Sequence, residues 1–233
     1  RIRARDNANN FSGYTTNASA TTQAPSESFT FTAGADYDYN FQGVNESLDA
    51  IAASGANFHL ALGDFSYGFA TEPVWCDYVK SRVGATFPFE LLSGDHEDGT
   101  NNPGDGLIGN FAACLPDRIG GITGTYAKEY YFDYPQVSPL ARFVLISPGL
   151  TFSTDGAYVY TVGSTRYNWV VNAIDNARAA GIKWGLVGTH RNCITTGYKE
   201  CSPAGIGSDI MNLLVSKKVD LILQGNDHTY QRS

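Results

Sequence analysis

The chain has 233 residues, of which 42% are hydrophobic, so it is long and apolar enough for one sizeable α/β domain with its own core. Its formal net charge is −7, and no basic run stands out beyond the first five residues, which argues against a nucleic-acid-binding patch that neutralises phosphates. No apolar stretch approaches the roughly 20 residues that a membrane span needs.

The first 28 residues are rich in Asn, Ser, Thr and Ala and contain few large apolar side chains. A segment of this composition buries too little apolar surface to form a core. We therefore predict an extended polar arm or linker over residues 1–28 and a folded domain over residues 29–233. The chain starts at Arg1 rather than Met and shows no signal peptide, which favours a processed or trimmed chain.

Apolar runs that alternate with helical patterns follow in chain order. Short apolar runs bounded by turn residues predict strands, whereas apolar residues spaced three and four apart predict helices. The predicted strands are 29–33, 58–62, 87–92, 126–134, 141–147, 183–189 and 219–224. The predicted helices are 42–54, 72–83, 105–115, 165–180 and 208–217. This alternation indicates a layered α/β fold.

Five of the apolar runs end in a short turn that carries Asp, His or Asn. One Gly-Asp turn after a strand is usually only a turn, but five such turns in one chain are a stronger signal. In open α/β sheets, ligands bind beyond the carboxyl ends of the strands. Carboxylates, imidazoles, an amide and a phenol on one rim predict a binuclear metal site. The residues in these turns are Asp36, Asp38, Asp64, Tyr67, Asp95, His96, His190, Asn226 and His228.

The order and spacing of these turns resemble the calcineurin-like metallophosphoesterases over residues 29–232. The matching segments are Asp36-x-Asp38, Gly63-Asp64-x-x-Tyr67, Gly94-Asp95-His96-Glu97, Val187-x-x-His190 and Gly225-Asn226-x-His228. Tyr67 is similar to the purple acid phosphatase branch. The resemblance implies an α/β/β/α sandwich with mixed sheets and a catalytic domain over residues 29–233. Because such domains usually continue with more strands, we expect this one to be C-terminally incomplete.

The resemblance also implies roles for these side chains. Asp64 would bridge two metal ions, and a metal-activated hydroxide would attack the phosphorus of a small-molecule phosphate ester. His96 would stand beside the phosphate and protonate the leaving oxygen. Arg191 could meet a substrate phosphate, although a surface arginine is the default interpretation. The first ion would be held by Asp36, Asp64, Tyr67 and His228, and the second by Asp64, Asp95, His190 and Asn226.

Three residues depart from the family pattern. The family has Asn at the position of Asp95, His at that of Asn226, and Gly or His at that of Asp38. The first two changes move the second site away from zinc and towards Mn²⁺, Mg²⁺ or Ca²⁺, and Asp38 becomes a further candidate ligand. We expect one or two divalent or trivalent ions, with Fe, Mn, Mg, Zn and Ca as candidates.

Two function classes remain open. The first is a secreted, metal-dependent phosphoric ester hydrolase. The second is a catalytically weakened or inactive domain of the same fold, in which a structural metal, calcium among the candidates, serves binding or assembly. The changed second site is the whole argument for the second class.

The cysteines and glycosylation sequons favour a secreted glycoprotein. Cys76 and Cys114 flank the turn at 94–98, and Cys193 and Cys201 bracket the loop after His190, so we predict two local disulfides, with four buried thiols as the alternative. The sequons begin at Asn10, Asn17 and Asn45.

Overall fold

The computed structural model describes residues 8–9, 28–201 and 206–233. The predicted arm over residues 1–28 therefore lies almost wholly outside the described residues, and so do the sequons at Asn10 and Asn17. Among the described residues, no helix has both the length and the apolar character needed to cross a membrane.

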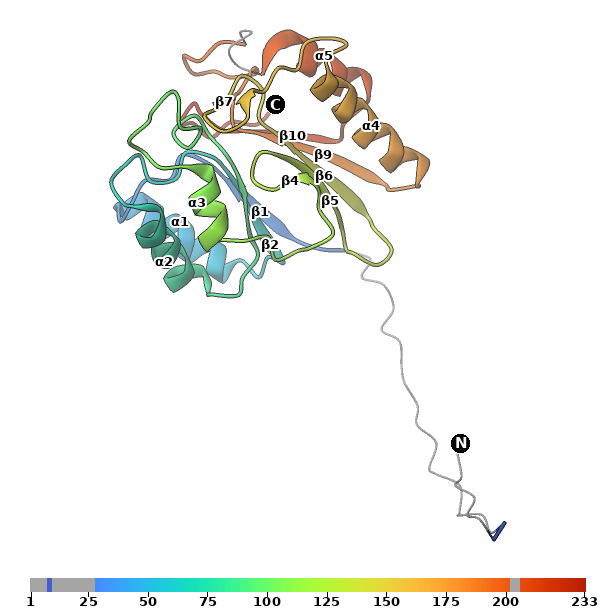
Figure 1. Cartoon of the computed structure of the whole chain (residues 1–233), viewed down its shortest axis with the longest axis horizontal. Helices are drawn as coiled ribbons and strands as arrows, with labels where there is room; N and C mark the ends of the chain where they lie inside the picture. The colour runs from blue at the N-terminus through green and yellow to red at the C-terminus, as the bar shows by residue number, and fades with distance from the viewer. Residues whose placement is uncertain (1–7, 10–27, 202–205) are drawn as a thin grey trace.

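Three parallel strands form the first sheet, in the order β1-β2-β3. They are β1 (Phe31–Gly34), β2 (Phe58–Leu62) and β3 (Phe89–Leu92). Helices α1 (Gln42–Ala53), α2 (Glu72–Val83) and α3 (Ile108–Cys114) lie on the outer side of this sheet, away from the second one (Figure 1). A helix separates each strand from the next, as parallel pairing requires.

Five strands form the second sheet, in the order β10-β9-β6-β5-β4. The strands are β4 (Thr123–Thr125), β5 (Glu129–Tyr134), β6 (Ala141–Ile146), β9 (Trp184–Thr189) and β10 (Leu221–Gln224). The pairs among β6, β9 and β10 are parallel, whereas β4 and β5 are antiparallel to their neighbours, so the sheet is mixed. Helices α4 (Thr165–Ala179) and α5 (Gly207–Ser216) cover its outer side (Figure 1).

The two sheets pack face to face around an aromatic core. Phe58, Leu60 and Leu62 of β2 pack with Phe132 of β5 and Phe143 of β6. The rings of Phe58 and Phe143 meet edge to face, with their centroids 5.2 Å apart. Every residue of β2 is buried, and all but His59 are apolar, as expected for a strand covered on both faces. This arrangement confirms the predicted layered α/β/β/α fold.

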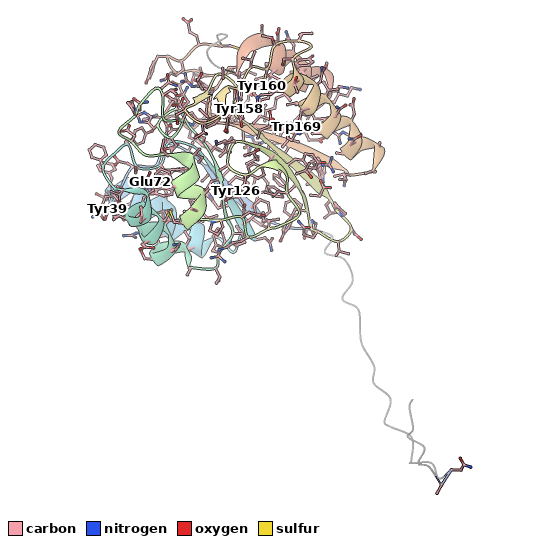
Figure 2. All side chains as sticks on the ribbon, viewed as in Figure 1. Tyr39, Glu72, Tyr126, Tyr158, Tyr160 and Trp169 are labelled. Atoms are coloured by element: carbon pink, nitrogen blue, oxygen red, sulfur yellow. A yellow bond between two sulfur atoms is a disulfide. The ribbon has the colours of Figure 1, made fainter. Side chains whose placement is uncertain are left out.

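Side chains fill the space between the helical and sheet layers (Figure 2). On the α4 side, Arg166 donates to Glu129 of β5 at 2.6 Å, and Tyr160 donates to the other oxygen of the same carboxylate. The guanidinium of Arg166 also lies 3.3 Å from the ring centroid of Tyr158. The carboxylate of Glu129 is thus fully paired inside the protein, as a buried charge must be.

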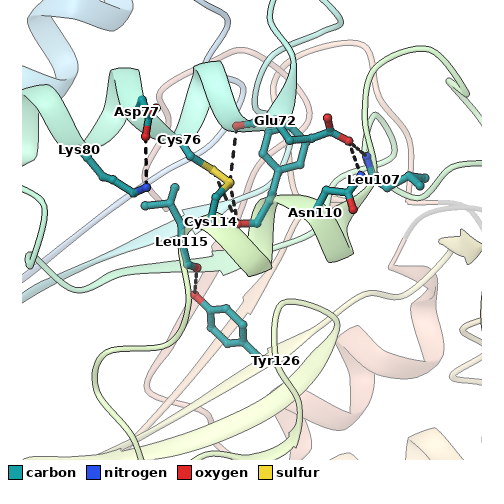
Figure 3. The surroundings of a disulfide bond; sticks show 10 residues. Glu72, Cys76, Asp77, Lys80, Leu107, Asn110, Cys114, Leu115 and Tyr126 are labelled. Carbon is teal, nitrogen blue, oxygen red and sulfur yellow. Dashed lines mark hydrogen bonds and ion pairs between the residues drawn. A yellow bond between two sulfur atoms is a disulfide. The ribbon is translucent and has the colours of Figure 1, made fainter.

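Two disulfides brace the loops that follow the strands. Cys76 of α2 is bonded to Cys114 of α3 (Figure 3), and Cys193 is bonded to Cys201 in the loop after β9. These are the predicted pairs, and the alternative of four thiols is wrong. Beside the first disulfide, Glu72 accepts hydrogen bonds from the amide of Leu107 and the side chain of Asn110, which ties the start of α3 to α2 (Figure 3).

The element boundaries differ from the predictions mainly at short or irregular segments. The bounds of β2 and α2 agree with the predicted ranges to the residue. We did not predict β4 or the hairpin of β7 (Thr151–Phe152) and β8 (Gly156–Ala157), which are too short to show a hydrophobic period. The predicted helix 105–115 begins only at Ile108, because Gly106 has a φ of 111° that a helix does not allow.

Candidate metal centre

Sharp turns at the ends of the strands point polar side chains towards one rim. Glycine occupies the closest approach between the turns after β2 and β3, since a Cβ on Gly94 would collide with the carboxylate of Asp64. Left-handed backbone conformations in non-glycine residues are uncommon and cluster at functional sites. Among the residues of these turns, φ is positive at Asp36, Asp38, Asp64, Tyr67, Asn226 and His228.

The carboxylate of Glu97 fixes the turn after β2 against the turn after β3. Its two oxygens accept hydrogen bonds from the amides of Asp64, Phe65 and Gly94, at 3.0, 2.6 and 3.0 Å. Glu97 is fully buried, so these amide bonds satisfy a charge or a carboxyl that water cannot reach. They hold the backbone of Asp64 rigidly, which presets the direction of its side chain.

Three donor atoms from the turns after β1, β2 and β10 form a compact triangle. The hydroxyl oxygen of Tyr67 lies 3.3 Å from Oδ1 of Asp36 and 3.1 Å from Nε2 of His228. Nε2 of His228 lies 3.4 Å from the same Asp36 oxygen. Donors that share one ion at about 2.1 Å lie roughly 3.0 Å apart in octahedral and 3.4 Å apart in tetrahedral coordination. The triangle therefore has the size that one shared ion imposes.

Asp64 and His190 border this triangle on its buried side. Nδ1 of His190 lies 2.8 Å from the carbonyl of Leu62, to which it donates, so Nε2 is the ring nitrogen that faces the rim. Nε2 lies 3.3 Å from Oδ1 of Asp64. Ligand atoms of Asp36, Asp64 and His190 all lie within 4.8 Å of one another, and no other such group of His, Cys, Asp and Glu occurs in the described part of the chain.

The surroundings of these groups favour a bound cation. Burial, together with the charges of Asp64 and Asp36, raises the pKa of the Tyr67 phenol above its usual value, so only a cation would make the phenolate favourable. Burial lowers the pKa of His190, but Asp64 and Asp95 raise it well above its usual value in sum. The donor set of carboxylate, phenol and imidazole suits iron and other hard or borderline cations, so the residues fit a metal ion.

Asp95 lies on the far side of His190 and faces a second cation. Its Oδ1 is 3.2 Å from Nε2 of His190 and 3.4 Å from Nε of Arg191. Burial raises the pKa of Asp95, but His190 and Arg191 together lower it by more, so the net pKa lies below its usual value. The carboxylate is therefore ionised at neutral pH. Asp95 does not belong to the cluster formed by Asp36, Asp64 and His190.

The backbone of Asn226 holds a carboxylate of the triangle. Its amide N–H donates to Oδ2 of Asp36 at 2.9 Å, and its side-chain Nδ2 donates to Asn192 at 3.4 Å. Both asparagines are buried. Asn226 therefore orients Asp36, and its side-chain Oδ1 stays the atom predicted to bind the second ion.

Asp38 is not brought to the cluster. Its Oδ1 accepts a hydrogen bond from the amide of Tyr39 at 2.5 Å, and its backbone carbonyl accepts one from the indole of Trp75. Asp38 lies in a sharp turn with left-handed backbone, so its side chain closes the turn on itself. The structure thus gives this aspartate a local role in place of the metal contact suggested from the sequence.

His96 lies beside the triangle and is held by an aspartate that sequence reasoning missed. Nδ1 of His96 lies 2.5 Å from Oδ2 of Asp105, and Nε2 lies 3.8 Å from Oδ2 of Asp64. The ring of His96 also meets that of Tyr67 edge on, with centroids 4.4 Å apart. A carboxylate on Nδ1 fixes the tautomer and turns Nε2 towards the rim. The sequence carries only a weak signal for this contact: Asp105 follows a glycine-rich loop, and we placed it at the start of a predicted helix.

Comparisons with known proteins identify the fold and nothing narrower. No protein-family model matches the chain, and no curated protein matches it. Purple acid phosphatase PPD1 from yellow lupin (Lupinus luteus) seeds aligns with a TM-score of 0.62 and 16% identity, over 85% of this chain and 37% of the lupin chain. A protein of Thermus thermophilus aligns with a TM-score of 0.45 and 11% identity, over 84% of this chain and 80% of that chain.

The chain thus spans little more than a third of the lupin protein that it matches. An alignment at this identity carries no information on the reaction or the substrate, since one fold supports many functions. Over 85% of its length, the chain has the fold of a purple acid phosphatase.

Proposed function

We propose that the chain is a metal-dependent phosphoric ester hydrolase that acts on small-molecule phosphate esters. The observation that carries the proposal is the triangle of Asp36, Tyr67 and His228, with Asp64 behind it and His96 beside it. A metal ion bound by these residues would lower the pKa of a coordinated water and polarise the phosphoryl oxygens. The resemblance of the sequence and the likeness in fold both support this reaction class.

The side chains around the ion would share the remaining work. His96 is oriented by Asp105, so its Nε2 can hold a proton and deliver it to the leaving oxygen. Arg191 lies next to Asp95, where its guanidinium can bind phosphate oxygens. Asp64 is buried, so its carboxylate faces the site from the inner side, away from bulk water. No covalent intermediate on the protein is required.

The second function class is a domain whose metal is structural. The side chain of Asn226 favours it, because its amide is held by Asn192 and offers the predicted second site only a neutral oxygen in place of an imidazole. Such a protein would bind an ion through the triangle, and would hydrolyse nothing. Calcium is a candidate for that role only if the oxygens of Asp36, Asp64 and Tyr67 hold it without the imidazole of His228, since calcium takes oxygen ligands.

Turnover of para-nitrophenyl phosphate distinguishes the two classes. The chain is stripped with a chelator and reloaded separately with Fe³⁺, Mn²⁺, Mg²⁺, Zn²⁺ or Ca²⁺. Hydrolysis that depends on the metal supports the hydrolase, and a His96→Asn variant should lose more turnover of an alkyl phosphate, whose leaving oxygen needs a proton, than of para-nitrophenyl phosphate. Tight metal binding with no turnover in any metal supports the structural role instead. The His96→Asn variant keeps the triangle, so its metal affinity serves as the folding control.

We also propose that the protein is secreted and glycosylated. The two disulfides support this location, since disulfides persist in oxidising compartments. The sequon at Asn45 lies in α1, where its Oδ1 accepts a hydrogen bond from Tyr78. Mass spectrometry before and after glycosidase treatment of the protein from its natural source tests the modification.

A further inference from the structure

We propose that the guanidinium of Arg191 takes the place of a second metal ion beside Asp95, so that the centre holds one ion per chain. This inference deepens the proposed function and rests on it only for the assumption that the triangle binds a metal. The resemblance of the sequence implies two ions. The geometry around Asp95 points to one ion and one arginine.

The position of Asp95 is the first reason. Its Oδ1 already faces two positively polarised partners, His190 at 3.2 Å and Arg191 at 3.4 Å. Asp95 is outside the cluster in which Asp36, Asp64 and His190 lie within 4.8 Å of one another. The oxygen of Asp95 that faces His190, which a second ion would need, is therefore already paired with Arg191.

The weak ligand is the second reason. A second ion at His190 and Asp95 needs a further side chain, and Asn226 is the residue at the expected position. Its Nδ2 donates to Asn192, and both residues are buried, so the amide can offer an ion only its uncharged Oδ1. The second position thus offers an imidazole, a neutral amide oxygen and one unshared carboxylate, besides Asp64, which the first ion also uses.

The charge balance is the third reason. Asp36, Asp64 and Asp95 supply three negative charges on this rim, and Glu97 is satisfied separately by backbone amides. One divalent ion and one guanidinium neutralise these three carboxylates. A second divalent ion next to Arg191 would instead place two cations against the single charge of Asp95, which is unfavourable at short range. Arginine cannot lose its proton to relieve this repulsion.

The guanidinium also has donors to spare for a substrate. Nε of Arg191 is buried and makes no hydrogen bond within the described residues, although it lies within ion-pair distance of Asp95. A guanidinium has five N–H donors in a planar fork that matches phosphate oxygens. Because Nε faces Asp95, the terminal N–H groups of Arg191 would be the ones that hold a phosphate oxygen in place of a second metal ion.

Metal stoichiometry tests the inference without reference to turnover. The full chain is stripped of metal, titrated with Mn²⁺, and measured by elemental analysis and electron paramagnetic resonance. We expect one tightly bound Mn²⁺ with the spectrum of an isolated ion. In an Arg191→Met variant, which keeps the length of the side chain but not its charge, we expect two ions and a spectrum broadened by their coupling. Arg191→Lys and the exposed control Arg232→Met should both stay at one ion.

Each outcome decides the matter. Two tightly bound, coupled ions in the unmodified protein would overturn the inference. So would an Arg191→Met variant that unfolds at the same temperature as the unmodified protein and still binds one ion. One ion in the unmodified protein and two in the variant, with no hydrolysis by either, would support the inference and refute the proposed function. An unmodified protein that binds no Mn²⁺ would refute both.

Discussion

The two sides of the metal centre use the same kinds of residue and reach different arrangements. On the side of Asp36, three donor atoms from three turns lie 3.1 to 3.4 Å apart with no arginine or lysine among them. On the side of Asp95, the carboxylate is paired with His190 and Arg191. The comparison shows that the residue types at strand ends do not by themselves give the number of bound metal ions. A neighbouring arginine can supply the positive charge that a second ion would bring.

Asp64 belongs to both sides, and its replacement should have the largest effect. Asp64→Asn removes the carboxylate that borders both the triangle and His190, so we expect metal affinity to fall by more than the roughly 100-fold that outer contacts cost. Hydrolysis should fall in parallel. Isothermal titration with Mn²⁺ measures the affinity. Asp49→Asn, which loses only a surface pair with Arg82, is the control and should bind Mn²⁺ normally. Unchanged affinity in Asp64→Asn would refute the assignment of the centre.

Asp105 distinguishes proton delivery from metal chemistry on the side of the triangle. Asp105→Asn leaves the metal ligands intact but replaces the charged acceptor on Nδ1 of His96 with a neutral amide. We expect turnover of an alkyl phosphate, whose leaving oxygen needs a proton, to fall about 10²-fold. Turnover of para-nitrophenyl phosphate should fall much less, since its leaving group needs no proton. Equal losses on both substrates would mean that Asp105 acts on folding alone. Asp155→Asn, which breaks an outlying pair with Lys128, is the matched control.

Exchange of two residues should convert the arginine-paired side into a metal site. In Asp95→Asn with Asn226→His, the new amide at position 95 no longer holds Arg191 in an ion pair, and the new imidazole at position 226 is a stronger ligand than the amide oxygen it replaces. We expect a second Zn²⁺ to bind about 10–100-fold more tightly than to the unmodified protein, with faster hydrolysis. Titration with Zn²⁺ measures this. A second affinity that stays unchanged would show that other residues exclude the ion.

Glu90 offers a buried carboxyl with no ion pair among the described residues, and its effect should be seen in stability alone. It lies in β3, where Oε1 accepts from the amide of Arg118 and Oε2 makes no hydrogen bond within the described part of the chain. The pKa of Glu90 is raised from 4.5 to about 8. Burial is the largest cause; the hydrogen bond from the amide of Arg118 opposes the rise, and the charge of Asp117 adds to it. The folded protein holds the proton that the unfolded chain has lost, so stability falls as pH rises from 4.5 to about 8.

Glu90→Gln removes this titration. Above pH 8, we expect the variant to be more stable than the unmodified protein by up to several kcal/mol, since each unit of pKa shift corresponds to about 1.4 kcal/mol. Near pH 4.5, the two proteins should differ little in stability. Thermal unfolding across pH measures this. A constant difference between the two proteins at all pH values would contradict the buried, protonated carboxyl. Metal affinity should stay unchanged.

Several elements could be predicted from the sequence because their local signals were strong. The apolar run at 58–62 and the proline at the start of 72–83 predicted β2 and α2 with the observed bounds. The turn residues after each strand indicated which side chains lie on one rim, because parallel strands end at the same edge. The two disulfides followed from the spacing of the cysteines around the loops. In each case the determining contacts are near in sequence or repeat regularly.

The pairings at the centre were decided only by the tertiary structure. Asp105 lies nine residues from His96 and bonds to it because Gly106 delays the start of α3. Asn226 turns to Asn192 because both are buried side by side, and Arg191 meets Asp95 across the edges of two sheets. The sequence by itself indicated most of the polar groups that reach the rim, since hydrophobic runs and turns act locally, but it included Asp38 and missed Asp105. Which of them face one another depends on how the two sheets pack, and packing joins residues that no local pattern relates.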